Sequence, residues 1–362
     1  MVEPERGSFV NERGLRLERY TWRASALMSK SFGVVDTKAK QPAGGDRSPA
    51  RESDDEGDGG TLPPAAVVTL VHGYGVHARF EALQPEFEGA PGHARYDGSI
   101  THALNEVGFD VQAFDLQGHG LSDKYRKMPC YVRDFDDFTK DVVQFVKIVR
   151  EEYRAKGGQQ PPVYVMGSSM GGLVATRMIQ TEGNSIVDGL LLLSPAVMMK
   201  DEDHWCCWYF FKKPVLTWFK PILYRVRMIK NQRPTDRNMW RTEKEDPLNY
   251  CGRMHFGMAS NMLQAQLRSR AGGQIELPYI ILSSPNDTHV NSTGSHDMFE
   301  QTTSKDKTLI WMNNMSHSLL YEPQGCKQVI RLAVNWILER VKPGTAGEAD
   351  CSEETGGYTV KR

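Results

Sequence analysis

One short segment combines a nucleophile with the backbone needed to present it. Gly167-Ser168-Ser169-Met170-Gly171 follows a β-rich run at 163–166 and precedes a helical pattern at 171–180. In this strand–turn–helix context, a G-x-S-x-G motif exposes its central serine at the carboxyl end of the strand. The flanking positions are glycine because so sharp a turn leaves no room for larger side chains. We therefore expect Ser169 to be a nucleophile, and the backbone N–H of Met170 to face a developing oxyanion.

Three further positions could complete this chemistry. A Gly-bearing turn follows the apolar run 65–71 and places the N–H of Tyr74 where a second oxyanion donor is expected. Asp287 follows the run 279–283 and His317 follows the run 308–312, which gives the chain order nucleophile, acid, base. We expect His317 to take the proton of Ser169 as it attacks an ester carbonyl, while Asp287 orients the imidazole. Water then hydrolyses the acyl-enzyme, and the reaction requires no metal or organic cofactor.

Other acids and histidines nearby fit these roles less well. Asp297 is the rival acid, but it falls inside a predicted helix. His289 and His296 do not follow the last predicted strand, so we interpret them as surface or packing residues. We expect His72, which opens the Gly-bearing turn, to hold a loop rather than to act as a base.

Strands alternate with helices along most of the chain, which predicts a mostly parallel sheet with helices on both faces. About 80 residues separate the strands near Leu193 and Tyr279, which is too long for a plain loop and indicates an inserted helical cap. The expected strands are 15–22, 65–71, 110–114, 163–166, 190–193, 279–283 and 308–312, and the expected helices are 99–107, 134–156, 171–180 and 327–341.

The chain divides into six predicted segments. Residues 38–62 and 344–362 hold few apolar side chains and much Gly and charge, so we expect a disordered insert and a disordered tail. The remaining segments are the N-terminal strands at 1–37, a first core part at 63–196, the cap at 197–276 and a second core part at 277–343.

Composition and charge indicate which cellular location and which binding partners to expect. Lys and Arg number 44 against 45 Asp and Glu, and this balance argues against general nucleic-acid binding. The charged N-terminus does not resemble a signal peptide, and no run reaches the roughly 18 apolar residues of a membrane span. The six cysteines show no metal-ligand spacing and read as reduced thiols. We expect a cytoplasmic protein, with peripheral membrane contact as an open alternative; the sequence does not indicate an oligomeric state.

The first half of the cap is strongly basic and aromatic. Residues 204–241 carry a net charge of +8, whereas the whole chain is at −1. Such a mixture suits the boundary between acyl chains and head groups, so we hypothesise reversible docking on an anionic membrane. The alternative is that the aromatic rings pack on the core and the charges are solvated. The residues concerned are Lys212, Lys213, Lys220, Arg225, Arg227, Lys230, Arg233, Arg237 and Arg241, with Trp205, Trp208, Tyr209, Phe210, Phe211, Trp218, Phe219 and Tyr224.

Four motifs in order give the chain a family resemblance. They are His72-Gly73-Tyr74-Gly75, Asp115-Leu116-Gln117-Gly118-His119-Gly120-Leu121-Ser122, Gly167-Ser168-Ser169-Met170-Gly171-Gly172, and His317-Ser318-Leu319-Leu320 with Glu322-Pro323. The chain resembles the monoacylglycerol lipase and lysophospholipase branch of the α/β-hydrolases, also called serine-aminopeptidase-like hydrolases. The resemblance implies the α/β-hydrolase fold, a triad of Ser169, Asp287 and His317, oxyanion donors at Tyr74 and Met170, and a structural turn at His119 and Gly120.

The chain departs from the family pattern at several positions. Val76 stands where the family usually has Glu after H-G-x-G, and Ser168 stands where it usually has His before the nucleophile. Ser284 replaces a common Gly three residues before the acid, and residues 81–98 resemble an insertion. We predict hydrolysis of single-chain lipid esters such as monoacylglycerols or lysophospholipids. A short-chain carboxylesterase or an acyl-thioesterase is the alternative, and a non-catalytic lipid-binding scaffold is a third reading.

Overall fold

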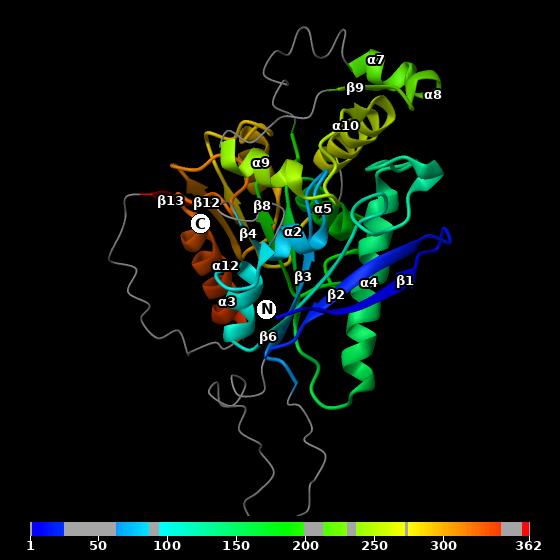
Figure 1. The fold of residues 1–362 in the computed structure, drawn as a ribbon. Coiled ribbons are helices and arrows are strands. Elements are labelled where there is room, and N and C mark those ends of the chain that lie inside the picture. Colours follow the sequence, from blue (N-terminus) through cyan, green and yellow to red (C-terminus); the bar gives the residue numbers. More distant parts are fainter. Residues whose placement is uncertain are drawn as a thin grey trace, which may run out of the picture.

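A nine-stranded sheet forms the centre of the protein (Figure 1). A computed structural model describes residues 2–24, 63–86, 94–198, 213–229, 237–271, 274–341 and 357–361. The strand order is β1-β2-β6-β3-β7-β8-β11-β12-β13, and the six strands from β6 to β12 are all parallel. Their bounds are β1 (Glu5–Val10), β2 (Arg16–Trp22), β3 (Ala66–Val71), β6 (Phe109–Phe114), β7 (Val163–Ser168), β8 (Gly189–Leu193), β11 (Tyr279–Ser283), β12 (Lys307–Met312) and β13 (Tyr358–Lys361).

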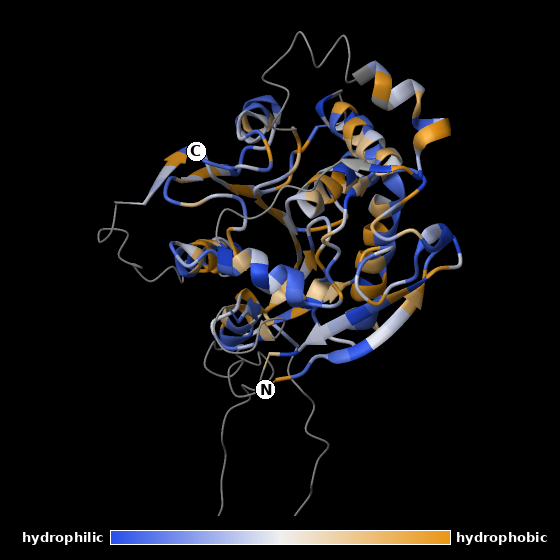
Figure 2. Ribbon diagram, turned by 45° about the horizontal axis from the view of Figure 1, so that its top comes forward, coloured by the Kyte–Doolittle hydropathy of each residue, from blue (hydrophilic) through white to orange (hydrophobic). Residues whose placement is uncertain are grey.

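Helices cover both faces of this sheet, which is why its inner strands are apolar runs. Successive residues of β3 alternate between two cores: Val67 and Val71 pack with α4 and α5, and Val68 and Leu70 pack with α3 and α12. Figure 2 shows the same division, with hydrophobic residues on the sheet and on the helix faces turned toward it. The helices are α2 (Ala78–Ala82), α3 (Ile100–Glu106), α4 (Asp136–Ala155), α5 (Met170–Glu182), α11 (Thr293–Gln301) and α12 (Cys326–Val341). These findings confirm the predicted α/β-hydrolase architecture.

The chain between β8 and β11 forms an insertion over the carboxyl ends of the strands (Figure 1). We use the name cap for its described residues. The cap is not purely helical, because β9 and β10 pair as a short antiparallel ribbon. Its last helix, α10, is joined to the core by the Gln266 amide, which donates to the Ala196 carbonyl at 2.7 Å. The elements are α7 (Lys213–Trp218), α8 (Lys220–Leu223), β9 (Arg227–Ile229), α9 (Arg237–Glu245), β10 (Met254–His255) and α10 (Phe256–Ala271).

The predicted disorder of the whole tail at 344–362 is wrong at its end. Tyr358–Lys361 forms β13, which pairs antiparallel with β12 at the edge of the sheet. The edge of β12 offers unpaired backbone groups, and the alternating Tyr358-Thr359-Val360 sequence can extend against it. The ammonium of Lys361 adds an ion pair with Glu300 at 2.5 Å.

Two other sequence predictions have a mixed outcome. The predicted insert at 38–62 lies outside the described residues. The segment 81–98 supplies the end of α2 and a minimal antiparallel pair of β4 (Gln84–Pro85) with β5 (Ala94–Arg95). No helix in the described ranges is both long enough and apolar enough to cross a membrane.

Candidate active site

The serine of the G-x-S-x-G motif sits on a sharp turn between β7 and α5. Ser169 has φ 50° and ψ −115°, a strained conformation for a non-glycine residue. A Cβ at Gly171 would lie 2.0 Å from the Val71 carbonyl oxygen, and one at Gly167 would lie 2.5 Å from the Gly171 carbonyl oxygen. Only glycine fits at both positions, as the motif predicts, and the turn holds the Ser169 hydroxyl beyond the end of the strand.

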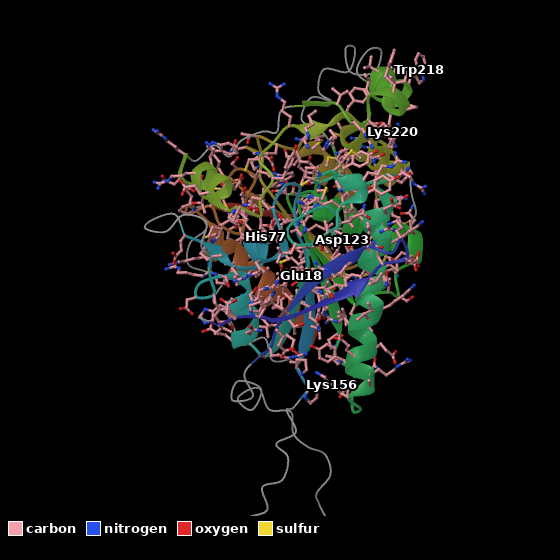
Figure 3. All side chains as sticks on the ribbon, turned by 45° about the vertical axis from the view of Figure 1, so that its right-hand side comes forward. Glu18, His77, Asp123, Lys156, Trp218 and Lys220 are labelled. Carbon is pink, nitrogen blue, oxygen red and sulfur yellow. The ribbon has the colours of Figure 1, made fainter. Side chains whose placement is uncertain are left out.

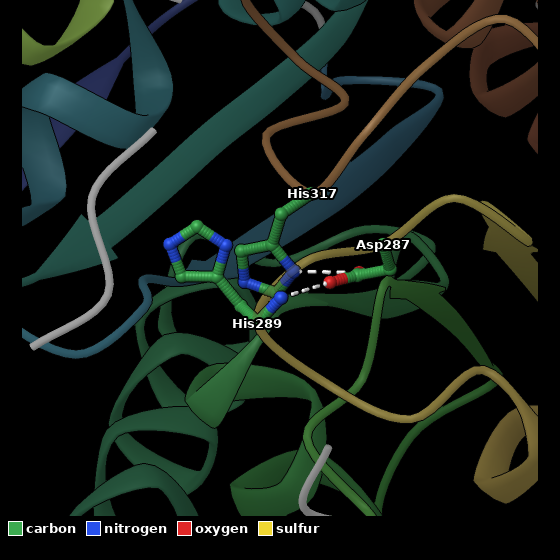
Figure 4. Close-up of side chains that lie close together, drawn as sticks. All are labelled: Asp287, His289 and His317. Atoms are coloured by element: carbon green, nitrogen blue, oxygen red, sulfur yellow. Dashed lines mark hydrogen bonds and ion pairs between the residues drawn. The ribbon is translucent and has the colours of Figure 1, made fainter. Parts of the chain in front are cut away.

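The structure brings the three predicted site residues together from the carboxyl ends of three parallel strands, β7, β11 and β12. The His317 Nε2 lies 2.9 Å from the Ser169 Oγ. Its Nδ1 lies 2.7 Å from the Asp287 Oδ2, and Figure 4 shows these two side chains. Asp287 is 1% exposed, and its other oxygen accepts the backbone N–H groups of His289 at 2.7 Å and Val290 at 2.9 Å. The carboxylate is thus fully engaged and holds the imidazole in one orientation.

Buried charges around His317 set its proton affinity. Burial disfavours the charged imidazolium, but the attraction and hydrogen bond of Asp287, together with the charges of Glu81 and Glu322, outweigh it and raise the pKa of His317. Burial would also raise the pKa of Asp287, but the imidazole and the two backbone N–H groups hold it below its usual value. Asp287 therefore stays ionised beside a histidine that readily accepts a proton.

The loops that carry the acid and the base are tied together. The Glu322 carboxylate accepts the backbone N–H of Ser316 at 2.6 Å and that of Ser318 at 2.8 Å, and so clamps the peptide on both sides of His317. The hydroxyl of Ser284, the position where the family commonly has Gly, donates to the Met315 carbonyl. This departure from the family pattern therefore adds a buried link between the two loops.

The turn after β3 lies against the nucleophile and is fixed by a neutral histidine. A Cβ on Gly73 would lie 3.5 Å from the Ser169 Cβ. The His72 Nε2 accepts the backbone N–H of Leu116 at 2.9 Å, so Nδ1 carries the proton that it donates to the Gly73 carbonyl at 2.8 Å. Complete burial, aided by the nearby His119, keeps the pKa of His72 well below its ordinary value. His72 thus holds the peptide that carries the Tyr74 N–H, as the sequence led us to expect of a loop-holding side chain.

Two glutamates near His317 were missed by sequence reasoning. Glu81 in α2 is buried, its carboxylate accepts the Gly73 N–H at 3.4 Å, and it bonds to the hydroxyl of Ser168. Burial raises its pKa. Glu243, from α9 of the cap, has its pKa raised to about 7, first by burial and also by the charge of Glu81. The sequence signal for Glu81 was that Val76 and Ser168 both depart from the family pattern. Glu81 lies five residues after Val76 and bonds to Ser168, the residue before the nucleophile.

The rival residues lie elsewhere, with one exception. Asp297 is in α11, as predicted, half-exposed beside His296 and away from Ser169. His289, by contrast, packs directly against His317 (Figure 4). Gly120 approaches the carboxylate of Asp115 so closely that a Cβ there would lie 2.2 Å from Oδ2, which supports the structural turn expected at His119 and Gly120.

One group of described side chains has metal-ligand spacing. Asp287, His289 and His317 offer ligand atoms within 4.8 Å of one another. A metal ion there would compete for the ring nitrogens of His317. Those nitrogens are already hydrogen-bonded to Asp287 and Ser169, an arrangement that suits proton transfer rather than metal binding.

Comparison with known proteins places the chain in a family. Residues 62–324 match the family of hydrolases described as serine aminopeptidase, S33. The chain is similar to monoglyceride lipase of Mus musculus, with 26% identity over 78% of this chain and 86% of that protein. It is also similar to caffeoylshikimate esterase of Arabidopsis thaliana, with 27% identity over 67% of this chain and 73% of that protein.

Solved structures agree on the fold. A soluble variant of monoglyceride lipase from Saccharomyces cerevisiae, in complex with a substrate analog, superposes with a TM-score of 0.67 at 17% identity, covering 94% of this chain and 97% of that one. Monoacylglycerol lipase from Paleococcus ferrophilus gives a TM-score of 0.61 at 22% identity, covering 76% and 95% of the two chains. The findings support the predicted carboxylic ester hydrolase on an α/β-hydrolase fold. The chain belongs to the serine aminopeptidase, S33, family of hydrolases.

Proposed function

We propose that this protein is a serine hydrolase that cleaves single-chain lipid esters, such as monoacylglycerols or lysophospholipids, through Ser169, His317 and Asp287. The observation that carries the proposal is the continuous hydrogen-bonded line from the Ser169 Oγ through both ring nitrogens of His317 to the Asp287 carboxylate. His317 takes the proton of Ser169 as its oxygen attacks the ester carbonyl, and then gives it to the leaving alcohol. Water hydrolyses the acyl-enzyme by the same route.

The oxyanion of each tetrahedral intermediate is bound by the backbone N–H groups of Tyr74 and Met170. Met170 is the first residue of α5, so its N–H is at the positive end of the helix dipole. Tyr74 follows the glycine whose backbone lies against Ser169, and its peptide is held by His72. Both donors are backbone groups fixed before substrate arrives, which is the arrangement that stabilises a developing oxyanion most.

Support for a lipid substrate comes from the relatives and from the cap. Three similar proteins are named monoglyceride lipases, but another is a caffeoylshikimate esterase, so a short-chain carboxylesterase is the alternative. The cap presents an apolar outer surface, which we call the cap tip. Trp218 and Ile222 are each 75% exposed and Phe219 is 46% exposed, and Figure 3 shows Trp218 on the outer side of the cap. The cap tip consists of Val215, Trp218, Phe219, Ile222 and Val226.

We propose that the cap tip docks on an anionic membrane, and that Lys220 is not one of the basic residues that contact it. Lys220 is half-buried, and its ammonium bonds to the Asn261 side chain and to the Arg133 carbonyl at 3.4 Å. Arg225 and Arg227 remain exposed at the edge of the tip, where each adds about 1 kcal/mol near an anionic leaflet. Lys212, Lys230, Arg233 and the aromatic residues from Trp205 to Phe211 lie outside the described residues.

The reaction is tested by labelling with a fluorophosphonate probe, followed by a substrate panel. We expect wild type to be labelled and Ser169→Ala to be unlabelled, and the best esters to be monoacylglycerols or lysophospholipids rather than di- or triacylglycerols. A preference for short acyl esters or acyl-thioesters would replace the lipid-ester assignment. Labelling that persists in Ser169→Ala, or no labelling of the folded wild type, would contradict the proposed nucleophile.

Docking is tested by liposome flotation with and without phosphatidylserine at low and high salt. We expect binding that needs the anionic lipid, weakens with salt and falls in Trp218→Ser/Ile222→Ser and in Arg225→Glu/Arg227→Glu. The matched control is Val10→Ser, which removes a 59% exposed apolar side chain from β1, outside the cap. Equal binding by all variants would leave the cap tip without a membrane role.

A further inference from the structure

The cap touches the catalytic core at the turn that carries the proposed oxyanion donor. After α9 the chain runs through residues 246–250, and this segment rests on residues 75–77 of the turn that follows β3. The backbone N–H of Tyr250 donates to the Gly75 carbonyl at 2.6 Å. A Cβ on Gly75 would lie 2.9 Å from the Tyr250 carbonyl oxygen, so the two backbones are in direct contact. Cap and turn therefore share a surface that leaves no space for an intervening side chain.

A buried pair of side chains reinforces this contact. The His77 Nε2 lies 3.0 Å from the Asp246 Oδ2, and the two residues are 3% and 8% exposed. The other oxygen of Asp246 accepts the backbone N–H of Leu248 at 2.8 Å, which shapes the segment that leads to Tyr250. Burial would raise the pKa of Asp246, but the hydrogen bond and charge of His77 hold it below the usual value. The pair is a specific connection, because a buried carboxylate is tolerated only with such partners.

These contacts hold two peptide groups of the turn that carries the Tyr74 N–H. The Tyr74 N–H lies between two carbonyls that are each held by a hydrogen bond. On the core side, the Gly73 carbonyl accepts from His72, and on the cap side the Gly75 carbonyl accepts from Tyr250. His77, two residues further on, is held by Asp246. The direction of the Tyr74 N–H is therefore set from one side by the core and from the other by the cap.

We propose that residues 246–250 of the cap, with Asp246 bonded to His77 as the central contact, position the oxyanion turn, so that the site is complete only when this part of the cap is seated. Asp246 is a positioning residue in this proposal, since it acts through His77 and the turn and does not touch substrate. The inference rests on the proposed ester hydrolysis at Ser169. Coupling the cap to the turn links closure over the substrate to stabilisation of the transition state.

The test compares Asp246→Ala, Asp246→Asn and His77→Ala in the full-length enzyme, using the best ester from the panel. Loss of one whole oxyanion donor lowers kcat by about 10²–10³-fold. A misdirected donor costs less, so we expect kcat of Asp246→Ala to fall about 10- to 100-fold with KM within about twofold. Asp246→Asn, whose amide can bond to His77 in either tautomer, should recover most of the activity.

Inhibitor binding separates positioning from a merely structural effect. A trifluoromethyl ketone with the acyl chain of that ester adds to the Ser169 hydroxyl and forms an oxyanion, whereas the matching ether analogue does not. We expect the Ki of the ketone to rise in Asp246→Ala by the factor lost in kcat/KM, while the Ki of the ether stays within about twofold. In a double-mutant cycle, His77→Ala/Asp246→Ala should be no worse than either single variant, because both remove one interaction.

The matched control is Glu245→Gln, at the residue next to Asp246, where an exposed carboxylate pairs only with Arg241 on the same helix among the described contacts. It should retain wild-type kinetics. A thermal unfolding curve of every variant shows whether that variant is folded at the assay temperature. The proposal is overturned if folded Asp246→Ala keeps its kcat within twofold, or if the Ki values of ketone and ether rise together. Failure of the proposed function would appear separately, as absent labelling of Ser169 in the wild type.

Discussion

The imidazole of His289 stacks on the imidazole of His317, with ring centroids 4.5 Å apart and planes 16° apart (Figure 4). His289 is two residues from Asp287, whose carboxylate accepts its backbone N–H. The same short loop therefore bonds to one nitrogen of His317 and covers a face of its ring. This relationship restricts rotation of the base out of the plane that joins Ser169 and Asp287.

We expect the stack to contribute measurably to turnover. An aromatic pair contributes about 0.5–1.5 kcal/mol beyond its buried area, so His289→Ala should lower kcat by about two- to tenfold. His289→Phe preserves a flat ring against His317 and should retain most of the activity. Steady-state kinetics of the two variants on one soluble ester provide the measurement. If His289→Phe lowers kcat as much as His289→Ala does, turnover depends on the ring nitrogens of His289 and not on the stacking contact.

The hydrogen-bonded line through His317 predicts a graded loss when its members are replaced. Ser169→Ala and His317→Ala should each lower kcat by roughly a million-fold, because the members act as a unit. Asp287→Asn should cost about 10⁴-fold, since it leaves nucleophile and base in place but favours the wrong tautomer. Single-turnover assays reach such low rates. A severe effect of Asp297→Ala with a mild effect of Asp287→Ala would show that the acid has been misassigned.

The raised pKa of His317 predicts the acid limb of the pH profile. The base must be neutral to accept the serine proton, and its ordinary pKa is 6.5. Since the site raises this pKa, kcat/KM should increase with pH through a midpoint above 6.5 and reach a plateau once His317 is deprotonated. Glu81→Gln removes a negative charge that favours the imidazolium, so its midpoint should move to lower pH. An unchanged midpoint would show that Glu81 acts only through its hydrogen bonds.

The C-terminal strand should stabilise the sheet without being needed for the chemistry. Truncation after residue 356 removes β13 and frees the edge of β12. Each net backbone hydrogen bond contributes about 0.5–1.5 kcal/mol, so we expect the free energy of unfolding to fall by about 1–3 kcal/mol in urea titrations. Ester hydrolysis should persist, because Ser169, Asp287 and His317 follow β7, β11 and β12 and none of them belongs to β13. A complete loss of folding would mean that β13 is part of the core.

Deletion of residues 40–60 gives a test of the insert that lies outside the described residues. The polar composition of this stretch predicts that it contributes no core, and long flexible loops cost only slightly more entropy than short ones. Folding and ester hydrolysis should therefore be nearly unchanged. A marked fall in melting temperature after the deletion would show that the segment packs.

Local sequence pattern predicted the parts of the molecule in which one stretch of chain decides the outcome. The buried strands are continuous apolar runs, so β3, β7, β8 and β11 were located to within a residue or two. Ser169, Asp287 and His317 were found because each follows a strand, and parallel strands end at one edge of a sheet.

The missed features depend on contacts between distant segments. Strand β1 is exposed on nearly every residue, so it carries no apolar alternation to detect. Glu81 reads as a surface helix residue, but burial against Gly73 and Ser168 makes it part of the site. Lys220 was counted as a free surface charge, yet Asn261 from the distant α10 engages its ammonium. Contacts of this kind follow from the tertiary fold, which no short sequence window contains.

The contact of the cap with the turn at residues 75–77 limits how the cap could be exchanged between this enzyme and its relatives. An insertion between two strands looks like an exchangeable module, because the two strands that flank it, β8 and β11, pair directly with each other. Residues 246–250, however, complete a core turn that lies more than 100 positions earlier in the chain. A chimera that imports a foreign cap should therefore keep this five-residue segment with its native core, and place its junctions on either side of Asp246 and Tyr250 rather than at the ends of the insertion.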